Sequence, residues 1–147
     1  MITISFAEKD DLCNIAKLSK NFEDEKCCYG IVSDSEEFFA DKNVIVAKDD
    51  DTVIGYCYGS VSTKTRNTSF FTSGQQSFYI EEIYILKNYR NKQIGAKLFA
   101  FVEDYAKSLG CEILETTAVS KDYQRLFNFY INKMNMQFWS ANLIKKI

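Results

Sequence analysis

The residues from Arg90 to Ala96 combine cations, a glycine and the start of an amphipathic segment, which together suit anion binding. Arg90 and Lys92 lie in a short polar stretch, and Gly95 falls in the first turn of the helix predicted to follow. The first N–H groups of a helix have no partner within it, and the helix dipole favours negative charge there. A glycine lets a phosphate approach the backbone closely. The segment therefore predicts a phosphate cradle, although it equally suits a cationic surface turn before a helix.

The cradle does not follow the glycine patterns of the common nucleotide-binding loops. Neither G-x-x-x-x-G-K-[ST] nor G-x-G-x-x-G occurs in the chain. These patterns place backbone amides around the phosphates of nucleoside triphosphates and dinucleotides. Their absence argues against P-loop and Rossmann-type binding.

The absence of histidine narrows the chemistry further. It excludes Ser-His-Asp hydrolysis, Cys-His proteolysis and histidine-ligated zinc. A cysteine nucleophile would lack a histidine to activate it, and the cysteines show no paired metal-ligand spacing, so we expect no metal site. General acid–base catalysis would then depend on carboxylates, tyrosines, lysines or cysteines. The five cysteines are Cys13, Cys27, Cys28, Cys57 and Cys111.

Two neighbouring carboxylates and one tyrosine are the acid–base groups whose positions stand out. Glu81 and Glu82 are adjacent in a predicted strand, so we expect their side chains on opposite faces. Tyr130 lies on the apolar stripe of the last predicted helix and should face inward. It also suits the role of a packed core tyrosine.

Periodicity predicts the elements that position these groups. The strands are expected at residues 2–6, 43–48, 52–62, 77–86, 111–119, 136–139 and 141–144. The helices are expected from residue 10 or 11 to 19, at 35–40, at 94–109 and at 122–134, and a long polar connection covers 63–77. This order is an α/β mixture with one parallel crossover near the middle.

Composition fits one ordinary globular domain of 147 residues, in which 46% are hydrophobic and 26% are charged. The net charge of −2 shows no basic excess, so we expect no nucleic-acid partner. We expect no secretory signal, because acidic residues from Glu8 onward come before any long apolar run. We also expect no membrane partner, because no apolar run of about 18 residues is present. The cytoplasm is the predicted compartment.

The run from Ile83 to Ala96 resembles the acetyl-CoA signature of the GNAT superfamily of N-acetyltransferases. That signature is a strand followed by Arg/Gln-x-x-Gly-x-Gly/Ala at a helix entry. Arg90 and Gly95 fill its first and last slots, and Gln93 replaces the middle glycine. The resemblance implies a single GNAT domain over residues 1–147. Its fold class is α/β, which some classification schemes call α+β. Its mixed, mostly antiparallel sheet would have six to seven strands and helices on both faces.

The resemblance also implies which residues hold acetyl-CoA. The backbones of Ile83, Tyr84 and Ile85 would pair with the pantetheine arm as an added strand. The strand at 83–85 would splay from the strand at 114–118 and open a wedge for the thioester. A free N–H there would stabilise the developing oxyanion. The pyrophosphate would bind amides of Gln93, Ile94, Gly95 and Ala96, beside Arg90, Asn91 and Lys92.

The Glu-Glu strand is similar to that of the polyamine (spermidine/spermine) acetyltransferase branch, which implies roles for both acids. Glu81 would be the base and Glu82 would hold a cationic substrate. Strand acids bridging to surface lysines are the alternative. The family also implies a tyrosine acid in the last helix. Tyr130 is the tyrosine present in this region, but the family pattern places its tyrosine at position 131, where this chain has Ile131. The two positions differ by one residue, or about 100° of helix rotation.

The resemblance therefore implies acetyl transfer from acetyl-CoA to a small cationic primary amine, by direct attack in a ternary complex. A peptide or protein N-acetyltransferase is one alternative. A catalytically degenerate CoA-binding sensor or interaction module is another, motivated by Gln93 and the displaced Tyr130. A homodimer is also expected, with Phe138 or Trp139 contributing to the contact.

Overall fold

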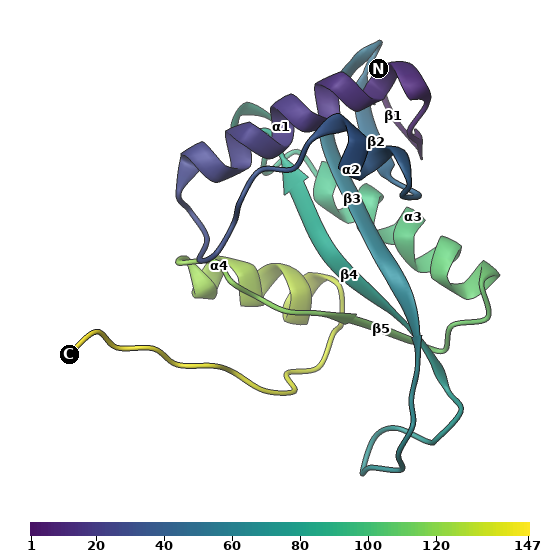
Figure 1. Cartoon of the computed structure of the whole chain (residues 1–147). Helices are drawn as coiled ribbons and strands as arrows, with labels where there is room; N and C mark the ends of the chain where they lie inside the picture. The colour runs from purple at the N-terminus through teal and green to yellow at the C-terminus, as the bar shows by residue number, and fades with distance from the viewer.

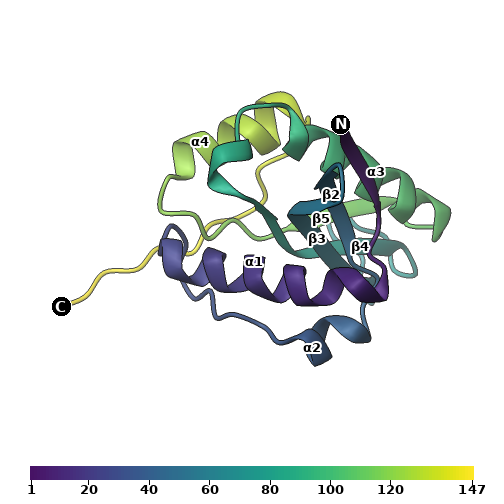
Figure 2. The same cartoon turned by 90° about the horizontal axis from the view of Figure 1, so that it is seen from above.

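A computed structural model describes all 147 residues. A mixed sheet lies between two layers of helices (Figures 1 and 2). Its strands are β1 (Ile2–Phe6), β2 (Ile45–Asp49), β3 (Thr52–Thr63), β4 (Gln76–Ile85) and β5 (Ile113–Thr116). The α-helices are α1 (Leu12–Glu25), α2 (Glu36–Ala40), α3 (Ile94–Ser108) and α4 (Tyr123–Phe127). Short 3₁₀ turns form at Lys9–Asp11 and Lys87–Tyr89, and a π-helix (Asn128–Lys133) continues α4.

The strands follow one another across the sheet in chain order, β1-β2-β3-β4-β5. Every pair is antiparallel except β4 and β5, which are parallel and joined through α3. This confirms the predicted α/β mixture with one parallel crossover. The polar connection predicted at 63–77 is the tip between β3 and β4.

The two faces of the sheet bury separate cores. On one face, α1 and α2 pack through Ile15, Phe22 and Phe39 against strand residues that include Tyr56 and Tyr84. On the other, α3 packs through residues that include Leu98 and Val102 against strand residues such as Phe78 and Ile80. Tyr130 belongs to this second core. Figure 2 shows α1 and α2 below the sheet and α3 and α4 above it.

The expected sixth and seventh strands do not form, and the sheet has five strands. Residues 136–139 and 141–144 carry no regular secondary structure. A strand needs a neighbour to pair with, and after the π-helix the chain runs away from the sheet (Figure 1). Trp139 packs instead on Phe71 at the β3–β4 tip, with ring centroids 5.3 Å apart. None of the helices is both long enough and apolar enough to cross a bilayer.

Candidate active site

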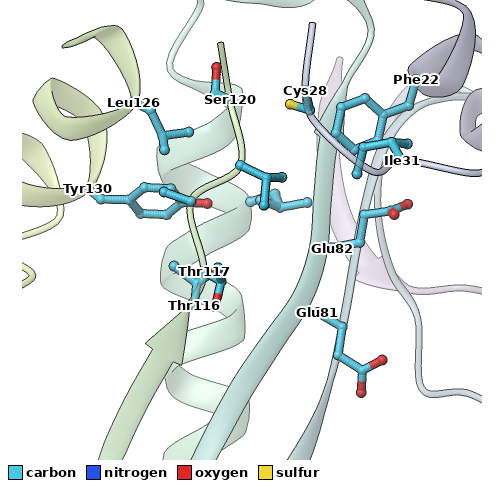
Figure 3. Close-up of a pocket in the computed structure, with 13 residues that line it drawn as sticks. Phe22, Cys28, Ile31, Glu81, Glu82, Thr116, Thr117, Ser120, Leu126 and Tyr130 are labelled. Carbon is cyan, nitrogen blue, oxygen red and sulfur yellow. The ribbon is translucent and has the colours of Figure 1, made fainter. Parts of the chain in front are cut away.

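The parallel strands β4 and β5 pair over only part of their length. Their register runs from Ser77 opposite Ile113 to Ile80 opposite Thr116, and β5 ends there. Residues 81–85 of β4 therefore have no partner on the β5 side. The two strands separate as expected, and their divergence opens a pocket (Figure 3).

The pocket collects side chains from distant parts of the chain. Figure 3 shows Tyr130 on one side and Glu81 and Glu82 on the other. Helix α1 and the segment after it contribute Phe22, Cys28 and Ile31, none of which the sequence singled out for this site. Other lining residues are Ile83, Thr116, Thr117, Ala118, Val119, Ser120 and Leu126.

A β-bulge at the mouth of the divergence changes the expected direction of one carboxylate. Tyr58 faces Glu82 across the β3–β4 ladder and Gly59 faces Ile80, so Glu81 is an extra residue on β4. The prediction that Glu81 and Glu82 point to opposite faces was therefore wrong. Both line the same pocket and project to the same side of the strand (Figure 3).

The two carboxylates differ in their surroundings. Glu81 is exposed, whereas Glu82 is half-buried and accepts a hydrogen bond from the Tyr56 hydroxyl. Burial raises the pKa of Glu82, and the nearby Asp34 carboxylate raises it further, while the Tyr56 hydrogen bond opposes both effects. A carboxylate with a raised pKa is better matched to accepting protons near neutral pH.

Tyr130 reaches the pocket from the π-helix. In this segment the backbone bonds span five residues, as from Met134 N–H to the Phe129 carbonyl at 3.0 Å. The wider turn accommodates an additional residue, and Tyr130 faces inward with 7% of its surface exposed. Burial raises the pKa of its hydroxyl, which therefore stays protonated at neutral pH.

The first turn of α3 leaves its amides free, as a phosphate cradle requires. Gln93 makes no side-chain cap bond, and the first backbone bond runs from Lys97 N–H to the Gln93 carbonyl at 3.1 Å. The N–H groups of residues 94–96 have no acceptor in the chain. A Cβ on Gly95 would meet the Phe129 ring at 3.5 Å, an ordinary contact, so packing does not require this glycine.

The position where the resemblance places a glycine has a glycine-like backbone. Gln93 has φ 62°, and Asn91, two residues earlier, has φ 63°. Left-handed backbone is uncommon for residues other than glycine. Gln93 therefore adopts a backbone conformation that glycine adopts more readily.

A protein-family model described as the acetyltransferase (GNAT) family matches residues 9–136. The chain belongs to this family. It is accordingly an acyltransferase, an N-acetyltransferase that uses acetyl-CoA. No curated protein matches the chain.

Solved structures of N-acetyltransferases share the fold of this GNAT protein. Ribosomal-protein-alanine N-acetyltransferase from Brucella melitensis biovar Abortus 2308 has a TM-score of 0.74 and 17% identity over 99% of both chains. Glucosamine-6-phosphate N-acetyltransferase from Arabidopsis thaliana has a TM-score of 0.72 and 18% identity over 99% of this chain and 98% of its own. An aminoglycoside N-acetyltransferase in complex with CoA has a TM-score of 0.72 and 15% identity over 100% of this chain and 95% of its own. At these identities the likeness establishes the fold and not the acceptor.

The Arg90 side chain is held by partners on α1 and β4. Its Nη2 donates to Glu25 at 2.8 Å, and its Nε donates to the Ile85 carbonyl at 2.8 Å. The guanidinium also lies over the Tyr84 ring, 5.4 Å from the centroid. Arg90 therefore braces the loop against α1 and β4, and its charge stays beside the cradle.

Other cations also lie near the cradle. Lys92 is exposed, with its ammonium 5.1 Å from the centroid of the Tyr89 ring. Arg125 of α4 donates to the Asn91 side chain at 3.0 Å. Sequence analysis missed Arg125, because no spacing rule connects it to residues 90–96. No group of three His, Cys, Asp or Glu side chains is arranged to hold a metal ion.

Proposed function

We propose that this GNAT enzyme transfers an acetyl group from acetyl-CoA to a primary amine of a small cationic molecule, with both substrates bound together. One observation carries the proposal. The free amides of the first turn of α3 lie beside the divergence of β4 and β5, and that divergence holds two carboxylates and a protonated tyrosine. Residues 1–147 act as one catalytic domain in this proposal.

The chain's own residues fit the cofactor. The N–H groups at Gln93, Ile94, Gly95 and Ala96 would bind the pyrophosphate, with Asn91, Lys92 and Arg90 supplying nearby polar and cationic groups. The unpaired edge of β4 at Ile83, Tyr84 and Ile85 would bind the pantetheine amides as an added strand. Bound there, acetyl-CoA supplies an activated acetyl group on sulfur.

Proton transfers are assigned to the groups that line the pocket. The amine nitrogen forms the new bond to the acetyl carbon, the carbon–sulfur bond breaks, and the amine proton passes to a carboxylate. Glu81 and Glu82 share the two tasks of accepting this proton and attracting a cationic acceptor. Tyr130 donates a proton to the departing sulfur. Its buried, protonated hydroxyl supports this role.

Direct attack is favoured over an acyl-cysteine route by the state of the only cysteine that lines this pocket. Burial and the adjacent Cys27 raise the pKa of Cys28 to about 12. The thiolate is the nucleophilic form of cysteine, so Cys28 is a poor nucleophile near neutral pH. The chain has no histidine to activate it.

The acceptor class follows from charge. Glu81, Glu82 and Asp34 lie on the α1 side of the sheet, where an acceptor would approach. Their carboxylates favour a cationic molecule electrostatically. The similarity of the Glu-Glu strand to the polyamine branch supports the same class, and a polyamine is the acceptor we propose to test first.

The deciding experiment measures CoA release from acetyl-CoA with a panel of diamines, polyamines, lysine-like amines, aminoglycosides, amino sugars and peptide N-termini. We expect the highest kcat/KM for acceptors that carry a second cationic group. Preference for peptides would replace the small-amine assignment with protein N-acetylation. CoA binding without acetylation of any amine would overturn the proposed reaction.

The proposed assembly is a homodimer formed through the C-terminal segment, where Phe138 and Trp139 are 57% and 61% exposed. Sedimentation of the wild type and of the Phe138→Ser, Trp139→Ser double variant tests this. A wild-type monomer at micromolar concentration contradicts it.

A further inference from the structure

Glu82 is held at the pocket by a buried tyrosine from the neighbouring strand. Tyr56 of β3 is fully buried, and its hydroxyl donates to Oε1 of Glu82. The bulge at Glu81 makes this contact possible, because it turns Glu82 to the face of the sheet that carries Tyr56. If β4 had no bulge, alternation counted from Ile80, which belongs to the α3-side core, would place Glu82 on the α3 side.

The second oxygen of Glu82 is left available. No hydrogen bond within the chain reaches Oε2. Every fully buried side-chain oxygen in the protein has a partner, so Oε2 is open to solvent. Glu82 lines the pocket, and its unbonded oxygen is therefore accessible to a bound acceptor. One oxygen is fixed and the other is free, as a positioned proton acceptor requires.

Tyr56 is itself fixed from α1. Ser19, also fully buried, contacts the Tyr56 hydroxyl, and its Oγ accepts the Asp34 N–H at 3.0 Å. The chain of contacts from Asp34 to Glu82 thus crosses α1 and β3. A side chain locked in this way keeps its partner in one geometry.

The electrostatic surroundings of Glu82 come from three parts of the fold. Tyr56, Cys57 and Tyr58 approach from β3, Asp34 approaches from the segment after α1, and Glu81 lies beside it on β4. The pKa of Glu82 is raised by burial first and by Asp34 in addition, and the Tyr56 hydrogen bond lowers it. Loss of that hydrogen bond would raise the pKa of Glu82 further.

We propose that Glu82, rather than Glu81, accepts the proton from the acceptor amine, and that Tyr56 is a positioning residue that fixes the Glu82 carboxylate. This rests on the proposed acetyl transfer. The ammonium nitrogen gives one proton to Oε2, and its freed lone pair forms the bond to the acetyl carbon. As the carbon–sulfur bond breaks, Tyr130 protonates the departing sulfur, and the second proton lost by the nitrogen returns to Tyr130 through water. The proton on Oε2 later leaves to water through the pocket. Glu81, which is exposed, attracts the cationic acceptor from the rim.

The test compares Glu82→Gln, Glu81→Gln and Tyr56→Phe in kcat/KM against pH, with the best acceptor of the wild type. Glu82→Gln should lower kcat by about 100-fold and remove the rise in rate that follows deprotonation of the base. Glu81→Gln should keep that rise and increase the acceptor KM. Tyr56→Phe should keep the rise but shift it to higher pH, because the hydrogen bond that lowers the pKa of Glu82 is gone.

Two further measurements separate this inference from folding and from the proposed reaction. Isothermal titration with CoA should give the same Kd for all three variants if they are folded. A weakly basic acceptor such as a hydrazide, already deprotonated at pH 7, should restore most of the rate of Glu82→Gln. Loss of the pH-dependent rise in Glu81→Gln, with its retention in Glu82→Gln, would overturn the inference. A wild type that acetylates nothing would instead overturn the proposed reaction.

Discussion

The Arg90 guanidinium lies 2.8 Å from the Glu25 carboxylate and ties the loop between β4 and α3 to the last turn of α1. Glu25 also accepts the Tyr84 hydroxyl at 2.6 Å, so one carboxylate joins helix, strand and loop. Both side chains of the ion pair are largely shielded from solvent. The contact couples the segment that we propose to bind the cofactor to the helix that leads into the pocket.

Glu25→Gln should destabilise the fold by about 1–2 kcal/mol at pH 7, because it removes a shielded charge-assisted interaction. Burial would raise the pKa of Glu25, but hydrogen bonds from Tyr84 and Arg90 outweigh it and the pKa is lowered. A lowered folded-state pKa gives stability that is present above the ordinary value of 4.5 and is lost as pH falls toward the lowered value. Urea denaturation of wild type and variant at pH 7 and below pH 4.5 measures the difference.

The matched control is Glu103→Gln on α3. Glu103 pairs with Lys107 at 2.7 Å on an exposed helix surface. Such exposed, solvent-screened pairs contribute little to stability, so Glu103→Gln should change it much less than Glu25→Gln. Equal losses of stability in the two variants, or a Glu25 effect that persists unchanged in acid, would contradict the bracing role.

Local patterning allowed much of this fold to be predicted. The apolar stripe of α3 places the helix at Ile94–Ser108, one residue shorter than predicted, because helical spacing alone determines it. The strands that failed to form, at 136–139 and 141–144, have the composition of strands but no neighbour. Strand formation depends on pairing, which short-range patterns do not report.

The candidate site was predictable where it depends on backbone amides and less so where it depends on side-chain direction. The predicted start of α3 correctly places its free first-turn amides at residues 94–96. The bulge at Glu81 arises from a long-range fit between β3 and β4, and it reversed the expected direction of one carboxylate. The π-helix carrying Tyr130 likewise has no local sequence signal, and its residues Phe129 and Tyr130 pack against Phe99 of α3.

Gly59→Ala should strongly perturb the bulge. A Cβ at this position would lie 2.2 Å from the Tyr79 carbonyl oxygen and 2.6 Å from the Phe78 ring, so the strands would have to shift. We expect a loss of about 1–3 kcal/mol in unfolding free energy and a higher KM for the acceptor. The neighbouring exposed variant Ser60→Ala should change stability by less than about 0.5 kcal/mol. Thermal denaturation of both decides whether close packing at Gly59 maintains the bulge.

Ala96→Glu should separate stability from cofactor binding. A carboxylate in the first turn of α3 interacts favourably with the helix dipole, by about 0.3–1 kcal/mol, and should leave the melting temperature equal or higher. The same charge repels a pyrophosphate, so the Kd for CoA should rise at least about tenfold, or 1.4 kcal/mol. Ala100→Glu adds the same charge at an exposed position one turn later and should bind CoA nearly as well as the wild type. Titration calorimetry that finds equal affinities for the two variants would remove the cradle from residues 94–96.

Gln93→Gly should stabilise the loop before α3. Gln93 has φ 62°, and left-handed backbone costs a residue with a side chain about 1–2 kcal/mol. Glycine avoids this cost but loses about 0.5–1 kcal/mol through its freedom in the unfolded chain. The net gain should be up to about 1 kcal/mol. Lys92→Gly, at a position without positive φ, should lose stability instead, and denaturant midpoints that rank the two variants in the opposite order would contradict the strain at Gln93.

Tyr130→Phe should lower kcat by about 100-fold with little change in melting temperature, because the ring keeps its packing in the α3-side core and only the proton donor is lost. The raised pKa of Tyr130 places its deprotonation above the ordinary value of 10.0, so the wild type should lose no activity through this group between pH 7 and 10. Tyr105→Phe is the control, since Tyr105 of α3 packs against Phe6 and Phe78 and does not line the pocket. Steady-state rates that are equal for all three proteins would show that water, and not Tyr130, protonates the departing sulfur.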